Sequence, residues 1–314
     1  MRLFQKKIRL AGRIVIHMQQ DGIYAACVNR LSASPAVEFV SFFPYGSATP
    51  AVALEKLARE LHAERYECIH LLGAHEYQLL SVEAPNVPVD ELKTAVRWRL
   101  KDMLDFHIDD ATIDVLDVPQ HKEAGNRSHS MYAVAARNQL IQQRQQMFAD
   151  AHFNLRVIDI PEMAQRNIAA LLETPERGLA LLSFDAEGGL LTITYGGELY
   201  LSRRIDVTLA QLASSDAELK TGYLERVTLE VQRSLDHFDR HYHVITLSRL
   251  LLSCAGAATE LRAHLGENLY IPSEVLDLAA LLDCTKAPEL ASAEAQQRYF
   301  LPLGAALRME ETVL

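Results

Sequence analysis

The sequence is poor in the residues that build metal and redox sites. It holds four cysteines in 314 residues, and none of them lies in a C-x-x-C pair, which excludes the common zinc and dithiol motifs. We expect free, mostly buried thiols, as in a reducing compartment. No Ser/His/Asp or Cys/His nucleophile signature is present either. The chain therefore gives no sign of a covalent or redox enzyme.

Long apolar runs and an excess of positive charge are also missing. No apolar run approaches the roughly 20 residues that a membrane-spanning helix needs, and the basic N-terminus lacks the features of a signal peptide. The net charge is −10, so the surface repels the phosphate backbone of a nucleic acid. We expect a cytoplasmic protein with no membrane span and no nucleic-acid partner.

Two clusters of potential metal ligands are interpreted as solvated surface. His237 and His241 have the i, i+4 spacing that can bind a metal, but no H-E-x-x-H motif is present and the segment is the polar end of a helix. Asp109 and Asp110 lie in a charged turn. We therefore expect no metal site.

The apolar pattern predicts an α/β protein with two lobes. Asp21-Gly22 between two apolar runs predicts a hairpin, and strands and a helix follow up to residue 72. Residues 77–160 have the order β-α-β-β-α-β, which predicts a ferredoxin-like insert. Residues 180–205 predict three strands joined by two glycine turns, a layout typical of a phosphate-cradling hairpin.

Four segments resemble one known family. They are SVEAPNVPVDELKTAVRWRLKDMLDFHIDDATIDVLDVP (81–119), ALLSFDAEGGLLTITYGGELYLSRRI (180–205), LEVQRSLDHFD (229–239) and FLPLGAALR (300–308). Together they resemble the PilM group of type IV pilus assembly proteins, and the first segment is most similar to members of the mannose-sensitive haemagglutinin (MSHA) pilus system. The resemblance runs over almost the whole chain.

This resemblance implies an actin-like (ribonuclease H-like) fold with a reduced second-lobe subdomain. The first lobe would comprise residues 1–175, including the insert at 77–160, and the second lobe residues 176–299. Residues 300–314 would form a C-terminal helix that returns to the first lobe. The connection between the hairpin and the long helix over 224–241 is short, so the small subdomain that the family usually places there would be missing.

The resemblance also implies a scaffold at the cytoplasmic face of the inner membrane. Such proteins bind the cytoplasmic tail of a PilN-like bitopic partner and contact other pilus platform proteins. Two alternatives remain open. One is a working actin-like ATPase that drives pilus assembly, and the other is a cytoplasmic protein of a type II secretion platform, similar to GspL.

The nucleotide loops that the family fold implies are degenerate in this chain. The first would hold Asp-x-Gly where His17 and Gln19 stand, and the second would hold it where Ser183 and Asp185 stand. A carboxylate about 4 Å from a phosphate costs on the order of 4 kcal/mol per pair of unit charges. The third, a Ser-Gly-Gly-Gly-Ala loop, is aligned with Ser248 and the bulky Arg249. We expect a pseudo-ATPase that needs no ATP or magnesium.

The predicted helix after residue 89 carries the candidate partner site. Arg97, Trp98, Arg99 and Lys101 place cations around one aromatic side chain, an arrangement that suits a peptide carboxylate or carbonyl. An ordinary amphipathic helix explains the pattern equally well. By analogy with the family, we expect this helix to form the wall of a groove between the insert and the first lobe.

Overall fold

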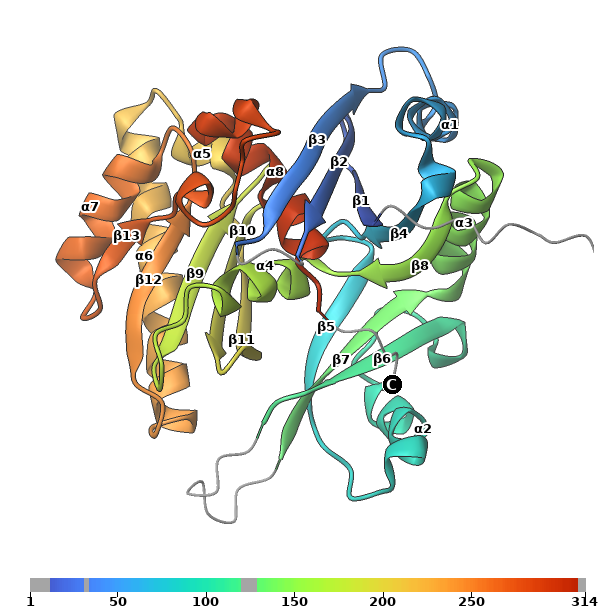
Figure 1. Ribbon diagram of the computed structural model, residues 1–314. Coiled ribbons are helices and arrows are strands. Elements are labelled where there is room, and N and C mark those ends of the chain that lie inside the picture. Colours follow the sequence, from blue (N-terminus) through green and yellow to red (C-terminus); the bar gives the residue numbers. More distant parts are fainter. Residues whose placement is uncertain (1–11, 31–33, 120–128, 310–314) are drawn as a thin grey trace, which may run out of the picture.

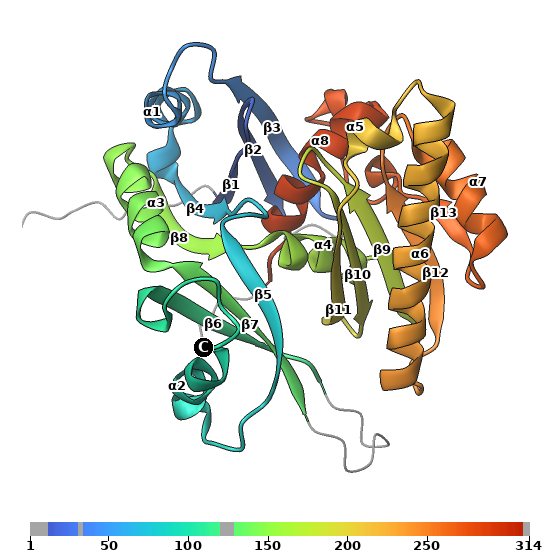
Figure 2. The ribbon, with the colours of Figure 1, turned by 180° about the vertical axis from the view of Figure 1, so that it is seen from behind.

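The computed structural model describes residues 12–30, 34–119 and 129–309. In these residues the strands form two five-stranded sheets and one three-stranded sheet. Each large sheet is the centre of one lobe, and the small sheet belongs to an insert that lies below the first lobe in the view of Figure 1. Figure 2 shows the same division from behind.

The first sheet is buried on both faces. Its order is β3-β2-β1-β4-β8. On β1, Ile14 and Ile16 pack with α1 and α3, whereas Val15 packs with α4 and α8 on the other face, as the two-residue period of a strand requires. The bounds are β1 (Gly12–Met18), β2 (Gly22–Asn29), β3 (Ala36–Pro44), α1 (Pro50–Leu61), β4 (Tyr66–Leu71), α3 (Asn138–Asp150), β8 (Asn154–Asp159), α4 (Pro161–Ala170) and α8 (Ala293–Ala306).

The second sheet has the order β11-β10-β9-β12-β13. The long helix α6 buries Val227, Val231 and Leu235 against it. Between β11 and α6 the chain forms only the short α5, so the expected short connection is confirmed. The bounds are β9 (Gly178–Phe184), β10 (Gly189–Tyr195), β11 (Glu198–Ile205), α5 (Leu209–Leu212), α6 (Ala217–His241), β12 (Leu247–Ser253), α7 (Ala258–Asn268) and β13 (Ser273–Val275).

Helices α4 and α8 pack against each other between the lobes. A Cβ atom at Gly304 of α8 would overlap the carbonyl oxygen of Ala164 in α4, so only glycine permits this approach. The carbonyl of Gly304 accepts a hydrogen bond from the Asn167 side chain at 2.9 Å. Through α8 the C-terminal part of the chain therefore returns to the first lobe, where it packs on β1 and β2. Residues 1–11 and 310–314 of the expected lobes lie outside the described residues.

The insert differs from the expected ferredoxin-like order in one strand. Its sheet has the order β5-β7-β6, while β8 pairs in parallel with β4 of the first lobe. Helix α3 likewise belongs to the lobe, because Phe148 is buried among first-lobe residues. The insert is therefore a three-stranded sheet with one helix, placed in the crossover between β4 and β8. Its bounds are β5 (Tyr77–Glu83), α2 (Val89–Leu100), β6 (Ala111–Asp117) and β7 (Ser130–Arg137).

Candidate functional site

Near the end of β1, just before the turn to β2, the chain carries a buried, neutral histidine. His17 is 4% exposed, and burial, with the neighbouring His70, lowers its pKa to about 4. Its Nδ1 lies 3.4 Å from the side-chain nitrogen of Gln19. The position where the family would hold a metal-ordering carboxylate is therefore uncharged at neutral pH.

Ser183 near the end of β9 and Asp185 in the turn between β9 and β10 both have structural hydrogen bonds. The Ser183 hydroxyl donates to the buried side chain of Gln165 at 2.6 Å. The Asp185 carboxylate accepts from the backbone N–H groups of Glu187 at 2.8 Å and Gly188 at 3.1 Å. Burial raises the pKa of Asp185. The side chain thus occupies backbone donors that could otherwise face an anion.

The third predicted loop was aligned wrongly. Ser248 and Arg249 lie within β12, where the Arg249 side chain donates to the carbonyl of Leu172 and pairs with Glu274 at 3.4 Å. The apolar run after Arg249 continues the strand because its leucines are buried. The turn that precedes α7 is Ser253-Cys254-Ala255-Gly256-Ala257. This turn keeps the first serine, a glycine and the last alanine of the family loop, so Arg249 is not a barrier at the cleft.

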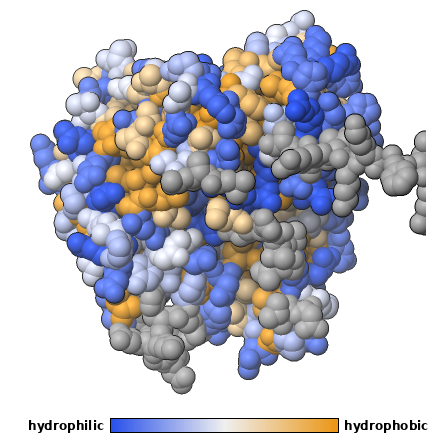
Figure 3. All heavy atoms as spheres, viewed as in Figure 1, coloured by the Kyte–Doolittle hydropathy of each residue, from blue (hydrophilic) through white to orange (hydrophobic). Residues whose placement is uncertain are grey.

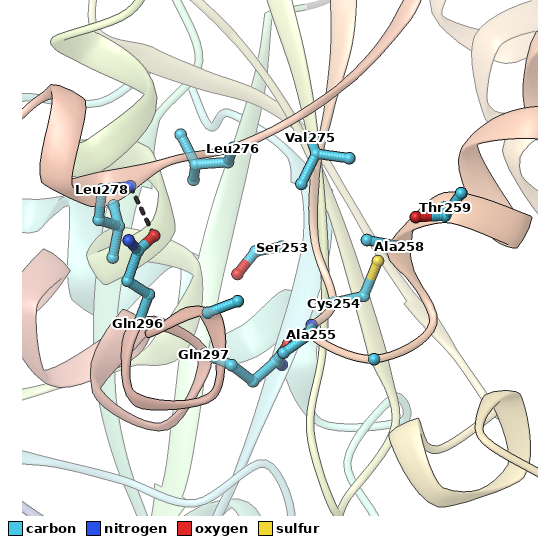
Figure 4. A pocket seen from close by; sticks show the side chains of 12 residues that line it. Ser253, Cys254, Ala255, Ala258, Thr259, Val275, Leu276, Leu278, Gln296 and Gln297 are labelled. Atoms are coloured by element: carbon cyan, nitrogen blue, oxygen red, sulfur yellow. Dashed lines mark hydrogen bonds between the residues drawn. The ribbon is translucent and has the colours of Figure 1, made fainter. Parts of the chain in front are cut away.

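A pocket of about 240 Å³ lies beside this turn. Figure 4 shows Ser253, Cys254 and Ala255 at this pocket, with Gln297 of α8 next to Ala255 and Gln296 of α8 next to Leu278. Its volume is below the roughly 300–1,000 Å³ of usual ligand pockets. Both glutamine side chains are engaged, with the backbone N–H of Leu278 donating to Gln296 and that of Ala255 to Gln297. The pocket is small, and its two glutamine side chains already have partners.

The surface near this pocket is partly apolar. Figure 3 shows apolar residues gathered over the second lobe, around β12 and β13, on the face that it draws. Val275 of β13 is 48% exposed and also lines the pocket.

A polar cluster, in which Tyr77 and Glu162 are buried and Arg204 is partly open to solvent, links the insert to both lobes. The Tyr77 hydroxyl, from β5, donates to the Glu162 carboxylate of α4. Arg204 of β11 donates to the Tyr77 oxygen at 2.6 Å and to Glu162 at 3.1 Å. Farther along the insert sheet, the Tyr132 hydroxyl donates to the carbonyl of Tyr200 and accepts from the N–H of Ser202, each at 3.2 Å. Three parts of the chain are therefore held together at β11.

The two faces of the insert sheet have different neighbours. Leu80, Val82 and Met131 pack with α2. Leu79 and Val134 point to the opposite face, where they pack with Ile158 of β8 and other residues of the first lobe. These three side chains are only partly buried, and β8 is an edge strand of its sheet among the described residues. An edge strand beside partly exposed apolar side chains is the surface to which an extended peptide can add.

The helix predicted to bind the partner, α2, does not form the wall of a groove with the first lobe. It packs on the outer face of the insert sheet, away from both lobes (Figures 1 and 2). Trp98 is 73% exposed. Arg97 pairs with Asp109 at 3.1 Å and Arg99 with Glu83 at 3.3 Å, and Lys101 is exposed.

The remaining candidates are structural. The rings of His237 and His241 stack with centroids 4.0 Å apart. In the part of the chain that the structure describes, no group of three or more His, Cys, Asp or Glu side chains is placed to hold a metal ion. The four cysteines are free, and Cys284 is the one that is not fully buried. None of the described helices is long and apolar enough to cross a bilayer.

Comparisons with solved structures identify the fold. A chain of the PilM–PilN type IV pilus biogenesis complex aligns with a TM-score of 0.72 at 19% identity, over 94% of this chain and 98% of that chain. A Bacteroides thetaiotaomicron protein with an actin-like ATPase fold aligns with a TM-score of 0.51 at 9% identity, over 93% and 99% of the two chains.

The cytoplasmic domain of EpsL, an inner membrane component of the Vibrio cholerae type II secretion system, gives a TM-score of 0.44 at 15% identity, over 65% and 75% of the two chains. No protein-family model matches the chain, and a search of curated proteins finds no match either. The chain therefore has an actin-like, two-lobed fold of the kind seen in PilM, which confirms the fold class predicted from its sequence.

Proposed function

We propose that this protein is an adaptor of a type IV pilus assembly platform that binds the cytoplasmic tail of a PilN-like partner without using ATP. The observation that supports it most is the alignment with the PilM chain of a PilM–PilN complex over nearly the full length of both chains. The partner would place this protein at the inner membrane. The likeness of residues 81–119 to the MshI members of the family favours an MSHA-type pilus.

The state of the nucleotide loops supports a role that does not need nucleotide. His17 is buried and neutral, and Ser183 is bound to Gln165. Asp185 fills the backbone donors of its own turn. The turn before α7 keeps part of the family pattern, so the proposal of a pseudo-ATPase rests on the first two loops.

The tail would bind where β8 faces the insert. An extended peptide can pair with β8, which is an edge strand among the described residues, and place alternate side chains against Leu79 and Val134. Leu79→Lys would put a cation in this apolar surface, and we expect it to weaken binding of a synthetic tail peptide at least about tenfold in calorimetric titrations. The change is tolerable because a partly buried lysine can extend its amine into water.

Leu80→Lys is the matched control. Leu80 is the next residue on β5 and is also partly buried, but its side chain points to the α2 face. The peptide should bind this variant as it binds the wild type. Equal weakening by both substitutions, or no binding of any candidate tail peptide to the wild type, would contradict the proposed site.

The predicted contacts on α2 remain part of the proposal, as an outer surface. Trp98, with Arg97, Arg99 and Lys101 around it, would contact a second protein of the pilus platform. Exposed tryptophan is typical of interface hot spots, and its truncation commonly costs about 2 kcal/mol or more. Trp98→Ala should therefore weaken binding to the reconstituted platform roughly 30-fold and leave affinity for the isolated tail peptide unchanged. The same affinity for the platform in the variant and the wild type would rule this surface out.

A further inference from the structure

A side chain of the second lobe reaches the backbone of the first lobe. Glu187 lies in the turn between β9 and β10, and its carboxylate accepts a hydrogen bond from the backbone N–H of Ala74 at 2.7 Å. Ala74 belongs to the turn that follows β4 in the first lobe. This contact joins two loops that are separated by more than a hundred residues in the sequence.

The first-lobe turn is occupied by carboxylates. Its Gly73 N–H donates to Glu76 at 2.9 Å, and a Cβ atom at Gly73 would lie 3.4 Å from one Glu187 oxygen and 3.7 Å from Glu76. Arg144 forms an ion pair with Glu76. Although burial opposes it, hydrogen bonds from Arg144 and the Gly73 N–H lower the pKa of Glu76. The turn is therefore a small anion site that the protein fills from both lobes.

We propose that the hydrogen bond from the Ala74 N–H to the Glu187 carboxylate, here called the latch, holds the two lobes in the arrangement that the structure shows. This inference deepens the nucleotide-independent role proposed above and rests on it. A carboxylate that accepts from a backbone N–H makes a charge-assisted hydrogen bond, stronger than a neutral one. The backbone of the same hairpin is fixed because Asp185 accepts from the N–H of Glu187 itself. The acceptor of the latch therefore lies in a fixed turn of the second lobe, and its donor is a backbone N–H of the first lobe.

The latch is connected through the structure to the insert, beside which the partner site is proposed. Its hairpin leads directly into β10 and β11, and Arg204 of β11 binds Tyr77 of the insert. By fixing the two lobes relative to each other, the latch would hold the insert in one orientation against β11. Without the latch, the second lobe and the insert would move more freely relative to the first lobe.

Two substitutions each remove the latch hydrogen bond, one at its acceptor and the other at its donor. Glu187→Ala removes the acceptor. Ala74→Pro removes the donor, and the turn tolerates it because Glu76 N–H donates to the Gly73 carbonyl at 3.1 Å, which places Ala74 at the turn position that favours proline. Glu225→Ala is the control, since Glu225 is an exposed second-lobe glutamate on α6.

The measurement is hydrogen exchange of the full chain, without nucleotide or peptide, read in the 72–77 and 184–189 segments. We expect exchange to quicken roughly tenfold in each latch variant, with a larger radius of gyration in solution scattering. The double variant should show no further increase, because both changes remove one contact. The Glu225→Ala control should behave as the wild type.

A rise of less than about threefold in either latch variant, or a further rise in the double variant, would overturn the proposal. Tail-peptide binding is measured separately, so loss of the adaptor function and absence of the latch give different results.

Discussion

At the residue scale, the side chains at the expected nucleotide-loop positions are buried or hydrogen-bonded within the protein. Ser183 donates to Gln165, which itself donates to the carbonyls of Leu181 and Leu190. His17 is buried next to His70, and burial lowers the pKa of His70 as well. The family resemblance predicts degenerate nucleotide positions here, but the partners of these side chains come from other segments and required the structure. The contacts give these residues a structural role in the folded protein.

The histidine at position 17 makes the protein sensitive to acid. Its pKa is about 4 in the folded state and about 6.5 in the unfolded chain. The unfolded state therefore binds more protons, so stability is complete above pH 6.5 and is lost as pH falls toward 4. At pH 5 the loss from this one group is about 2 kcal/mol.

Urea unfolding of wild type and His17→Gln at pH 7.5 and pH 5 checks this effect. We expect the variant to lose about 2 kcal/mol less of its unfolding free energy between these pH values. Equal losses would show that His17 is not a buried neutral group.

At the element scale, the sequence predicted the kind of each segment better than its partners. The period of apolar residues identified α6 and the hairpin of β9 to β11. It could not show that β8 pairs with β4, because the alternation of apolar residues along a strand does not specify which other strand it pairs with. The error at Arg249 had another cause. The resemblance aligned the family's Ser-Gly-Gly-Gly-Ala loop with the segment that starts at Ser248. That segment is a strand instead, and its run Leu250-Leu251-Leu252 is the buried centre of β12.

Glycine substitutions test the packing of α8 on α4. Gly304→Ala should lower the unfolding free energy by about 1–3 kcal/mol, because the new methyl group meets the Ala164 carbonyl. Gly222→Ala in α6 has open space around it and should raise the unfolding free energy by about 0.5–1 kcal/mol. Urea unfolding of both variants would contradict this account of the α4–α8 contact if their effects had the same sign.

At the scale of the whole molecule, the two lobes and the insert of an actin-like fold are held together by the protein's own side chains. The lobes meet through α4 and α8 and through the bond from Ala74 to Glu187. The insert is fixed to the second lobe through Tyr132 and Arg204. We infer that the lobes serve as a rigid support for the insert, where partner binding is proposed. The resemblance predicted this division, while the contacts that produce it required the structure.

The central claim is that partner binding needs no nucleotide. Isothermal titration of the full chain with the PilN-like tail peptide, with and without Mg-ATP, tests it most directly. We predict the same affinity in both titrations, and no heat when Mg-ATP is titrated alone. Peptide binding that appears only with Mg-ATP, or tight Mg-ATP binding that is lost when Ser183 or Asp185 is changed, would contradict the account.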